Sequence, residues 1–122
     1  MTFWCRIITT TRISRGTGST IVDFRNGQLT VFFQNSQKAG LSTGVAALKA
    51  GFVLVAGMPT TDGTAGTVQP GSLLVINSAG RIVWSLAGKS QIDGPWDFRV
   101  YDQGTTVTMF VSNVLNGTIG SS

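Results

Sequence analysis

Two segments that resemble one another decide the fold: 20-TIVDFRNGQLTVFF-33 and 73-LLVINSAGRIVWSL-86. Each consists of two short apolar runs joined by a turn that contains glycine. The resemblance continues beyond them, because the stretches Thr20 to Met58 and Leu73 to Asn113 both read as an apolar hairpin, a glycine, a second hairpin and an apolar exit. Self-similarity of this length is the mark of a repeat protein, in which each unit buries its face against its neighbour.

Aligned residues make the repeat checkable. The anchors are three pairs at offsets of 53, 54 and 57 residues: Gly27 with Gly80, Gly40 with Gly94, and Phe52 with Met109. In the last apolar run of each unit, which we call the exit run, this alignment matches Val53, Leu54 and Val55 with Phe110, Val111 and Ser112. The differences between the offsets lie in loops, so the repeat concerns the apolar runs.

The apolar runs predict strands, because they are too short for helices and are rich in Val, Ile, Leu and Phe. Turn signals such as Asn26-Gly27 separate them. The predicted strands are Thr20–Phe24, Gln28–Phe33, Val45–Leu48, Phe52–Ala56, Leu73–Asn77, Arg81–Leu86, Phe98–Asp102 and Thr105–Val111. Four strands in a unit of roughly 50 residues are typical of a β-propeller blade, whereas a sandwich would not repeat itself in this order.

We therefore expect an all-β fold that is a fragment of a β-propeller. It would contain about two four-stranded antiparallel blades with incomplete flanking strands. The partial propeller domain spans residues 16–119, and residues 120–122 form a tail.

The first fifteen residues, MTFWCRIITTTRISR, fit neither a strand nor a helix pattern. Their codons read two bases on permit DILVSNYNNNENLQG, in which ILVSN aligns with Val53–Gly57 and Phe110–Val114. We interpret residues 1–15 as a doubtful terminus produced by a frameshift. The alternative is a genuine but divergent terminus.

Three segments resemble a known family: GTGSTIV, GLSTGVAALKAGFVLVAGMPTTDGTAGTVQPGSLLVINSAGRIV and DGPWDFRVYDQGTTVTMFVSNVLNGTI. They are similar to bacterial, usually exported, NHL-repeat-like β-propeller proteins, which are largely uncharacterised. The resemblance spans Gly16 to Ile119, and residues 1–15 lie outside it. It implies a secreted or periplasmic propeller rather than an activity, and the export signal would lie upstream, since Met1 to Thr10 has no signal-peptide pattern.

The basic charge does not indicate a nucleic-acid partner. The formal net charge is +4, but Arg6, Arg12 and Arg15 belong to the doubtful terminus. From Gly16 onward six basic residues oppose five acidic ones, which leaves +1. The six are scattered singly and form no stripe: Arg25, Lys38, Lys49, Arg81, Lys89 and Arg99.

Composition also argues against catalysis, because the chain has no His and no Glu and its one Cys is Cys5. Triads and zinc sites therefore fail. Asp62, Asp93 and Asp97 lie in glycine-rich segments, where turns are favoured over calcium binding. We expect a non-enzymatic scaffold that binds a protein or a small ligand, without a cofactor or metal. The alternative is a fragment of a metal-dependent, lactonase-like propeller hydrolase.

Two segments are candidates for special roles. The cluster Gly94, Pro95, Trp96 and Asp97 predicts a rigid turn followed by an aromatic ring that packs between blades, although Trp96 could instead stack on a ligand. The loop Met58 to Gly71 is long for a hairpin connection, and it is either a ligand-binding loop or a mobile surface loop. Its candidate contacts are Thr60, Thr61, Asp62 and Thr64.

No apolar run approaches the roughly 20 residues of a membrane span. Hydrophobic residues make up 42% of the chain and charged residues 11%, and two blades cannot close a ring. We therefore expect exposed blade edges, self-association through them and poor solubility as a monomer.

The frameshift interpretation predicts the surrounding DNA. The bases upstream of the Met1 codon should continue the shifted frame into further apolar repeats, which sequencing of the locus would show. A stop codon in that frame just upstream would leave the divergent terminus as the explanation.

Overall fold

The computed structural model describes residues 5–9, 19–35, 41–60, 65–87 and 92–114. This part of the chain contains no α-helix and only one short 3₁₀ turn, η1 (Ala65–Thr67). Its strands are β1 (Cys5–Thr9), β2 (Ser19–Arg25), β3 (Gln28–Asn35), β4 (Leu41–Ala47), β5 (Val53–Met58), β6 (Ser72–Ile76), β7 (Ile82–Ala87), β8 (Pro95–Asp102) and β9 (Val107–Asn113). All pairings are antiparallel. The expectation of an all-β fold is confirmed.

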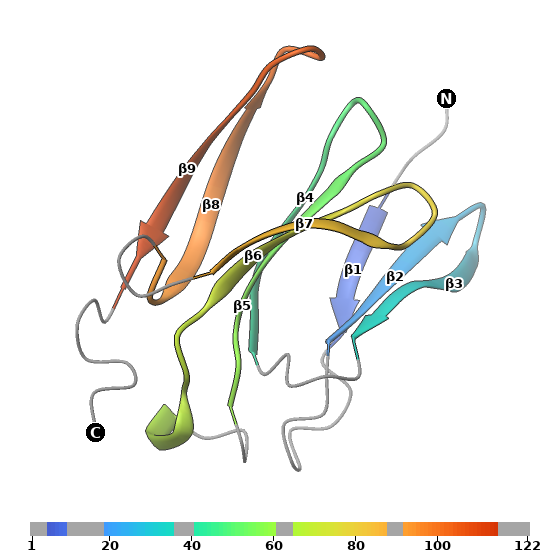
Figure 1. Ribbon diagram of the computed structural model, residues 1–122. Coiled ribbons are helices and arrows are strands. Elements are labelled where there is room, and N and C mark those ends of the chain that lie inside the picture. The colour runs from blue at the N-terminus through green and yellow to red at the C-terminus, as the bar shows by residue number, and fades with distance from the viewer. Residues whose placement is uncertain (1–4, 10–18, 36–40, 61–64, 88–91, 115–122) are drawn as a thin grey trace.

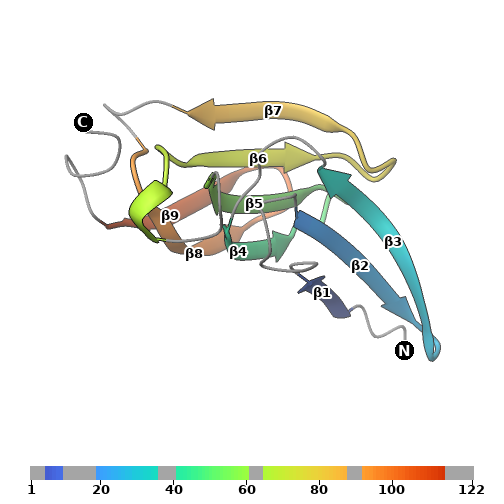
Figure 2. The same ribbon diagram turned by 90° about the horizontal axis from the view of Figure 1, so that it is seen from below.

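The strands form three sheets in chain order: β1-β2-β3, β4-β5-β6-β7 and β8-β9. The sheets lie next to one another, with the four-stranded sheet between the other two (Figure 1). The view from below shows the same order (Figure 2). Within the described residues no sheet closes on itself.

The predicted hairpins are present, with strand ends within a few residues of those expected. Their turns have the backbone geometry that the sequence demands. Asn26 has a φ of 49° and Gly27 one of 79°, which is the left-handed pair required by a two-residue hairpin turn. Gly104 takes a φ of 91° between β8 and β9.

The sheets do not coincide with the sequence units. The hairpin β4-β5 ends the first unit and β6-β7 begins the second, yet these four strands form one sheet. The described residues therefore contain one four-stranded sheet rather than two. The reason is that β5 pairs with β6 continuously from Val53 with Ile76 to Gly57 with Ser72.

The N-terminal segment contains a strand that the sequence did not predict. β1 pairs with β2 from Cys5 opposite Phe24 to Thr9 opposite Thr20. It lies beside β2 as β5 lies beside β6. Residues 1–4 and 10–18 lie outside the described part, and the frameshift stays a prediction.

Strand β5 is buried on both faces and holds the three sheets together. Val53, Leu54 and Val55 are all buried, although neighbouring residues of a strand point to opposite faces. One cluster faces the β8-β9 sheet and consists of Leu54, Ala56, Leu73, Ile92 and Phe98. The other faces the β1-β2-β3 sheet and consists of Ile21, Val53, Val55 and Ile76.

Pairing register corrects the alignment of the exit runs. A bulge opens both β4 and β8, and the pairs that follow it are comparable. The third pair is Ala46 with Leu54 in one hairpin and Arg99 with Phe110 in the other. Leu54 therefore corresponds to Phe110 rather than to Val111. A shift of one residue exchanges the two faces of a strand, and apolar residues at consecutive positions hid that shift.

Contacts between the middle sheet and β8 depend on residues without side chains. A Cβ atom at Gly71 would collide with Cδ of Pro95 and would lie 2.7 Å from the carbonyl oxygen of Gly57. The amide of Gly71 donates a hydrogen bond of 2.7 Å to the carbonyl oxygen of Asp93. Glycine at this position lets the start of β8 lie directly on the middle sheet.

Substitution of Gly71 tests this contact. Gly71→Ala should lower the free energy of unfolding by about 1–3 kcal/mol, because the backbone must move to admit a methyl group. Urea denaturation would measure the change, and Ser78→Ala in the exposed turn before β7 should shift stability by less than about 0.5 kcal/mol. Equal stability of Gly71→Ala and the wild type would show that this packing does not hold the sheets.

Candidate functional site

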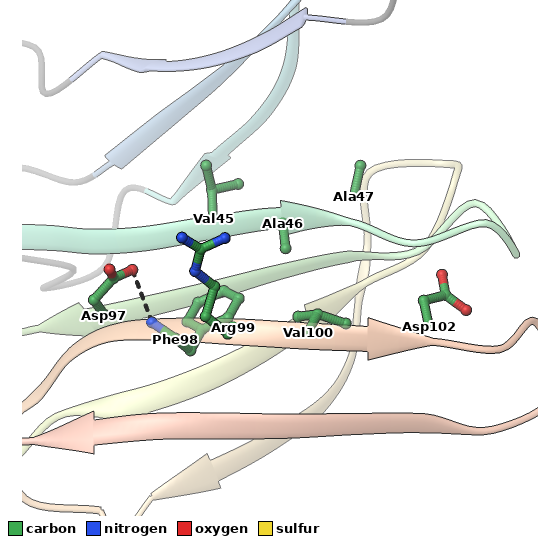
Figure 3. Close-up of a pocket in the computed structure, with 8 residues that line it drawn as sticks. All are labelled: Val45, Ala46, Ala47, Asp97, Phe98, Arg99, Val100 and Asp102. Atoms are coloured by element: carbon green, nitrogen blue, oxygen red, sulfur yellow. Dashed lines mark hydrogen bonds between the residues drawn. The ribbon is translucent and has the colours of Figure 1, made fainter.

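An open groove runs between β4 and β8, the facing edge strands of the middle and third sheets (Figure 3). Its volume is about 440 Å³, which falls in the range of small-molecule sites. The residues that line it are Val45, Ala46, Ala47, Asp97, Phe98, Arg99, Val100 and Asp102. Both strands are sheet edges, so the groove lies where two sheets meet without pairing.

Small residues on β4 leave the room for this groove. A Cβ atom at Gly44 would lie 3.0 Å from both Cδ1 and Cε1 of Phe98. The ring of Phe98 is therefore in contact with the β4 backbone and is buried. Ala46 and Ala47 continue the small side chains along the strand. Apolar side chains of Phe98, Ala46 and Ala47 thus form part of the groove lining.

Hydrogen bonds join the two sheets at both ends of the groove. At one end the hydroxyl of Thr43 donates to the carbonyl oxygen of Pro95 at 2.5 Å. At the other end the amide of Lys49 donates to Oδ2 of Asp102 at 2.6 Å. These contacts span more than fifty residues of sequence, and they fix the separation of β4 and β8.

Both carboxylate oxygens of Asp102 accept hydrogen bonds from backbone amides. Its Oδ2 accepts from Lys49, and its Oδ1 accepts the amide of Gly104 at 2.8 Å. The backbone hydrogen bond from Lys49, and then that from Gly104, lower the pKa of Asp102 below its usual value. Desolvation opposes this shift, and the charge of Lys49 contributes to it. Asp102 is therefore ionised at neutral pH, and its carboxylate links the end of β8 to the backbone at Lys49.

Asp97 and Arg99 supply the polar groups directed into the groove (Figure 3). Asp97 is exposed, and its Oδ1 accepts the amide of Phe98 at 2.8 Å. Arg99 is also exposed, and its guanidinium group forms no ion pair with the described residues. The site thus presents the carboxylate of Asp97 and the guanidinium group of Arg99 in a groove that apolar side chains also line.

The predicted turn at Gly94 and Pro95 is held from a distant strand. Oδ1 of Asn113 accepts the amides of Asp93 at 3.0 Å and Gly94 at 2.7 Å. The carbonyl oxygen of Gly94 accepts the amide of Val114 at 2.8 Å. The side chain of Asp93 is only 1% exposed. The side chain of Asn113 thus ties the backbone of this segment to the end of β9, and nothing in the sequence singled Asn113 out.

Trp96 lies at the bulge where β8 begins, and 55% of its surface is exposed. Pro95, which precedes it, and Phe98, two residues after it, are buried. Pro95 and Phe98 lie between the middle and third sheets. A packing role for Trp96 stays a prediction.

The candidate loop after β5 is described only in part. Thr60 is 4% exposed, and its hydroxyl shares a hydrogen bond of 2.7 Å with that of Thr67. Thr60 also bridges to Val68, which closes the base of the loop. Thr61, Asp62 and Thr64 lie outside the described residues. A ligand-binding role for this loop stays a prediction.

Sequence analysis included Asp97 in its candidates but missed the rest of the groove. Arg99 was interpreted as one of several scattered surface charges, and Asp102 as the end of a strand. The run Gly44-Val45-Ala46-Ala47 was the available signal, since small residues in a strand often mark the close approach of another group. That signal does not reveal which strand approaches.

Two further properties of the described residues concern metal ions and membranes. They hold no group of three or more His, Cys, Asp or Glu side chains arranged for a metal ion. They also contain no helix with the length and apolar character needed to cross a membrane. The hydrolase alternative is not tested by these observations.

Comparison with known proteins gives no match among family models, curated proteins or solved structures. The resemblance to NHL-repeat-like proteins therefore stays a prediction.

The hydrogen bonds to Asp102 predict a pH dependence of stability. A folded-state pKa below the unfolded value of about 3.9 stabilises the protein above that pH, and the contribution is lost as pH falls through the folded value. Asp102→Asn should therefore unfold at lower urea than the wild type at pH 7, and the difference should shrink below about pH 4. Gln103→Ala, in the adjacent turn, should leave the wild-type pH profile unchanged. A difference between Asp102→Asn and wild type that does not depend on pH would contradict the assignment.

Proposed function

We propose that the chain is part of a β-propeller that binds a small organic anion, without catalysis, in the groove between β4 and β8. The observation that carries the proposal is that the guanidinium group of Arg99 and the carboxylate of Asp97 line the same groove, together with apolar side chains such as Phe98. Arg99 would pair with a carboxylate or similar anion of the ligand. Asp97 would accept a hydrogen bond from a hydroxyl, amide or amine of the same ligand.

The sheet arrangement supports the propeller part of the proposal. Propeller blades are four-stranded antiparallel sheets placed around a central channel. The middle sheet has four strands in chain order, and a sheet packs on each of its faces. In a propeller, β4 and β8 would be the innermost strands of neighbouring blades. The groove would then open toward the channel.

Binding rather than catalysis is favoured by the chemistry of the lining residues. Asp97 and Asp102 are the carboxylates of the groove, and both oxygens of Asp102 already accept backbone amides. The protein has no histidine to act as a base or metal ligand. Asp97 with Arg99 can orient a ligand by charge and hydrogen bonding.

A titration with matched probes tests the proposal. N-acetylglycine and glucuronate carry a carboxylate, whereas N-acetylglycinamide and glucose are neutral counterparts of similar size. The anionic probes should raise the thermal unfolding midpoint, with about 1.4 kcal/mol of stabilisation at ten times their dissociation constant. Their effect should weaken as salt is added, and the neutral probes should have little effect.

The variant Arg99→Gln should weaken binding of the anionic probes about tenfold or more, equivalent to about 1.4 kcal/mol. Arg81→Gln is the matched control, because Arg81 is also exposed but lies in the turn before β7. Asp97→Asn should keep affinity for the anion and lose the preference for probes with hydrogen-bond donors. Equal binding by Arg99→Gln and wild type, or no preference of the wild type for anions, would refute the proposal.

A further inference from the structure

Charges of opposite sign alternate along β8 where this strand lines the groove. The charged residues of the lining are Asp97, Arg99 and Asp102. A ligand with only a negative charge would pair with Arg99, but the carboxylate of Asp97 in the same groove would repel it. The lining therefore favours a ligand that carries a positive group as well as an anionic one.

Asp102 is the less suitable of the two carboxylates for binding such a positive group. Its two oxygens each accept a backbone amide, Oδ2 from Lys49 and Oδ1 from Gly104. These two hydrogen bonds, followed by the positive charge of Lys49, lower the pKa of this carboxylate. The protein itself thus already compensates the negative charge of Asp102.

Asp97 keeps one carboxylate oxygen available. Its Oδ1 accepts the amide of Phe98 at 2.8 Å. The same oxygen lies beside β4, because a Cβ atom at Gly44 would be 3.5 Å from it. Its Oδ2 accepts no hydrogen bond from the described residues. One oxygen therefore holds the carboxylate beside β4, and the other can accept a hydrogen bond from a ligand.

Asp97 and Arg99 line the groove together without pairing with each other. Both side chains are exposed and extend from β8 toward β4 (Figure 3). The structure shows no ion pair between the two groups. Opposite charges that line one groove and do not neutralise one another can both be satisfied by a single molecule that carries both charges.

The positions of the two residues on β8 set the separation of the charges in that molecule. Pairing with β9 is regular from Asp97 with Ser112 to Arg99 with Phe110. Asp97 and Arg99 therefore lie on the same face of the sheet, about 7 Å apart along the strand. An ammonium group and a carboxylate joined through one carbon atom fit this interval, since each is about 3 Å from its hydrogen-bond partner.

We propose that the ligand of the groove is an α-amino acid, with its carboxylate on Arg99 and its ammonium group on Asp97. This assignment rests on the proposed function, because Arg99 must bind an anion there. The ammonium group donates a charge-assisted hydrogen bond to Oδ2 of Asp97. It also removes the repulsion that Asp97 exerts on a ligand with only a negative charge.

Four compounds built on glycine separate the contributions of the two charges. Glycine carries both, N-acetylglycine only the carboxylate, glycinamide only the ammonium group, and N-acetylglycinamide neither. Titrations at neutral pH, followed through the NMR signals of the Arg99 side chain and the Phe98 amide, give each dissociation constant. Glycine should bind about fivefold more tightly than N-acetylglycine, which corresponds to an exposed ion pair of about 1 kcal/mol.

Variants of the two residues assign each charge to its partner. Asp97→Asn should remove the preference for glycine over N-acetylglycine, and Asp97→Glu should retain it because the carboxylate is kept. Arg99→Gln should remove the preference for glycine over glycinamide. Circular dichroism would establish that each variant folds, and the comparison of the four compounds on the wild type needs no variant.

The outcomes separate this assignment from the proposed function. If the wild type binds N-acetylglycine as tightly as glycine, or if Asp97→Asn keeps the full preference for glycine, the α-amino acid assignment is overturned and the anion site at Arg99 stands. If N-acetylglycine does not bind, or binds equally to Arg99→Gln, the proposed function fails and this assignment fails with it.

Discussion

Burial of β5 on both faces is the constraint on which the rest of the structure depends. A strand with Val, Leu, Val and Ala in succession cannot lie on a surface, because each face would expose apolar side chains to water. A sheet built around it must therefore be covered on both sides. The hairpins β2-β3 and β8-β9 supply those covers, and each brings its own apolar residues into one of the two clusters.

The close approach of β8 follows from that requirement and creates the groove as a by-product. Phe98 can cover the middle sheet because Gly44 has no side chain in its way, and Pro95 can do so because of Gly71. The edges of β4 and β8 then face each other without forming a ladder. Asp102 fastens one end of this gap, while Asp97 and Arg99 line it and are exposed.

The sequence predicted the hairpins well, because their signals are local: apolar runs of strand length and turns such as Asn26-Gly27. The grouping of hairpins into sheets depends on contacts between distant segments, so the repeat alone could not show that β5 pairs with β6. The assignment of Leu54 to Val111 failed because consecutive apolar residues carry no information about which face is which. The groove was missed for a similar reason, since Arg99 and Ala46 meet only through packing of separate sheets.

Alternate residues of β5 pack against different sheets. Positions 53 and 55 pack against the β1-β2-β3 sheet, which precedes them in the chain. Positions 54 and 56 pack against Ile92 and the β8-β9 sheet, which follow them. Inherited changes at odd and even positions would therefore be compensated at opposite ends of the polypeptide. Coevolution in this strand should divide into two interleaved sets, so that a single stretch of six residues records the history of two separate interfaces.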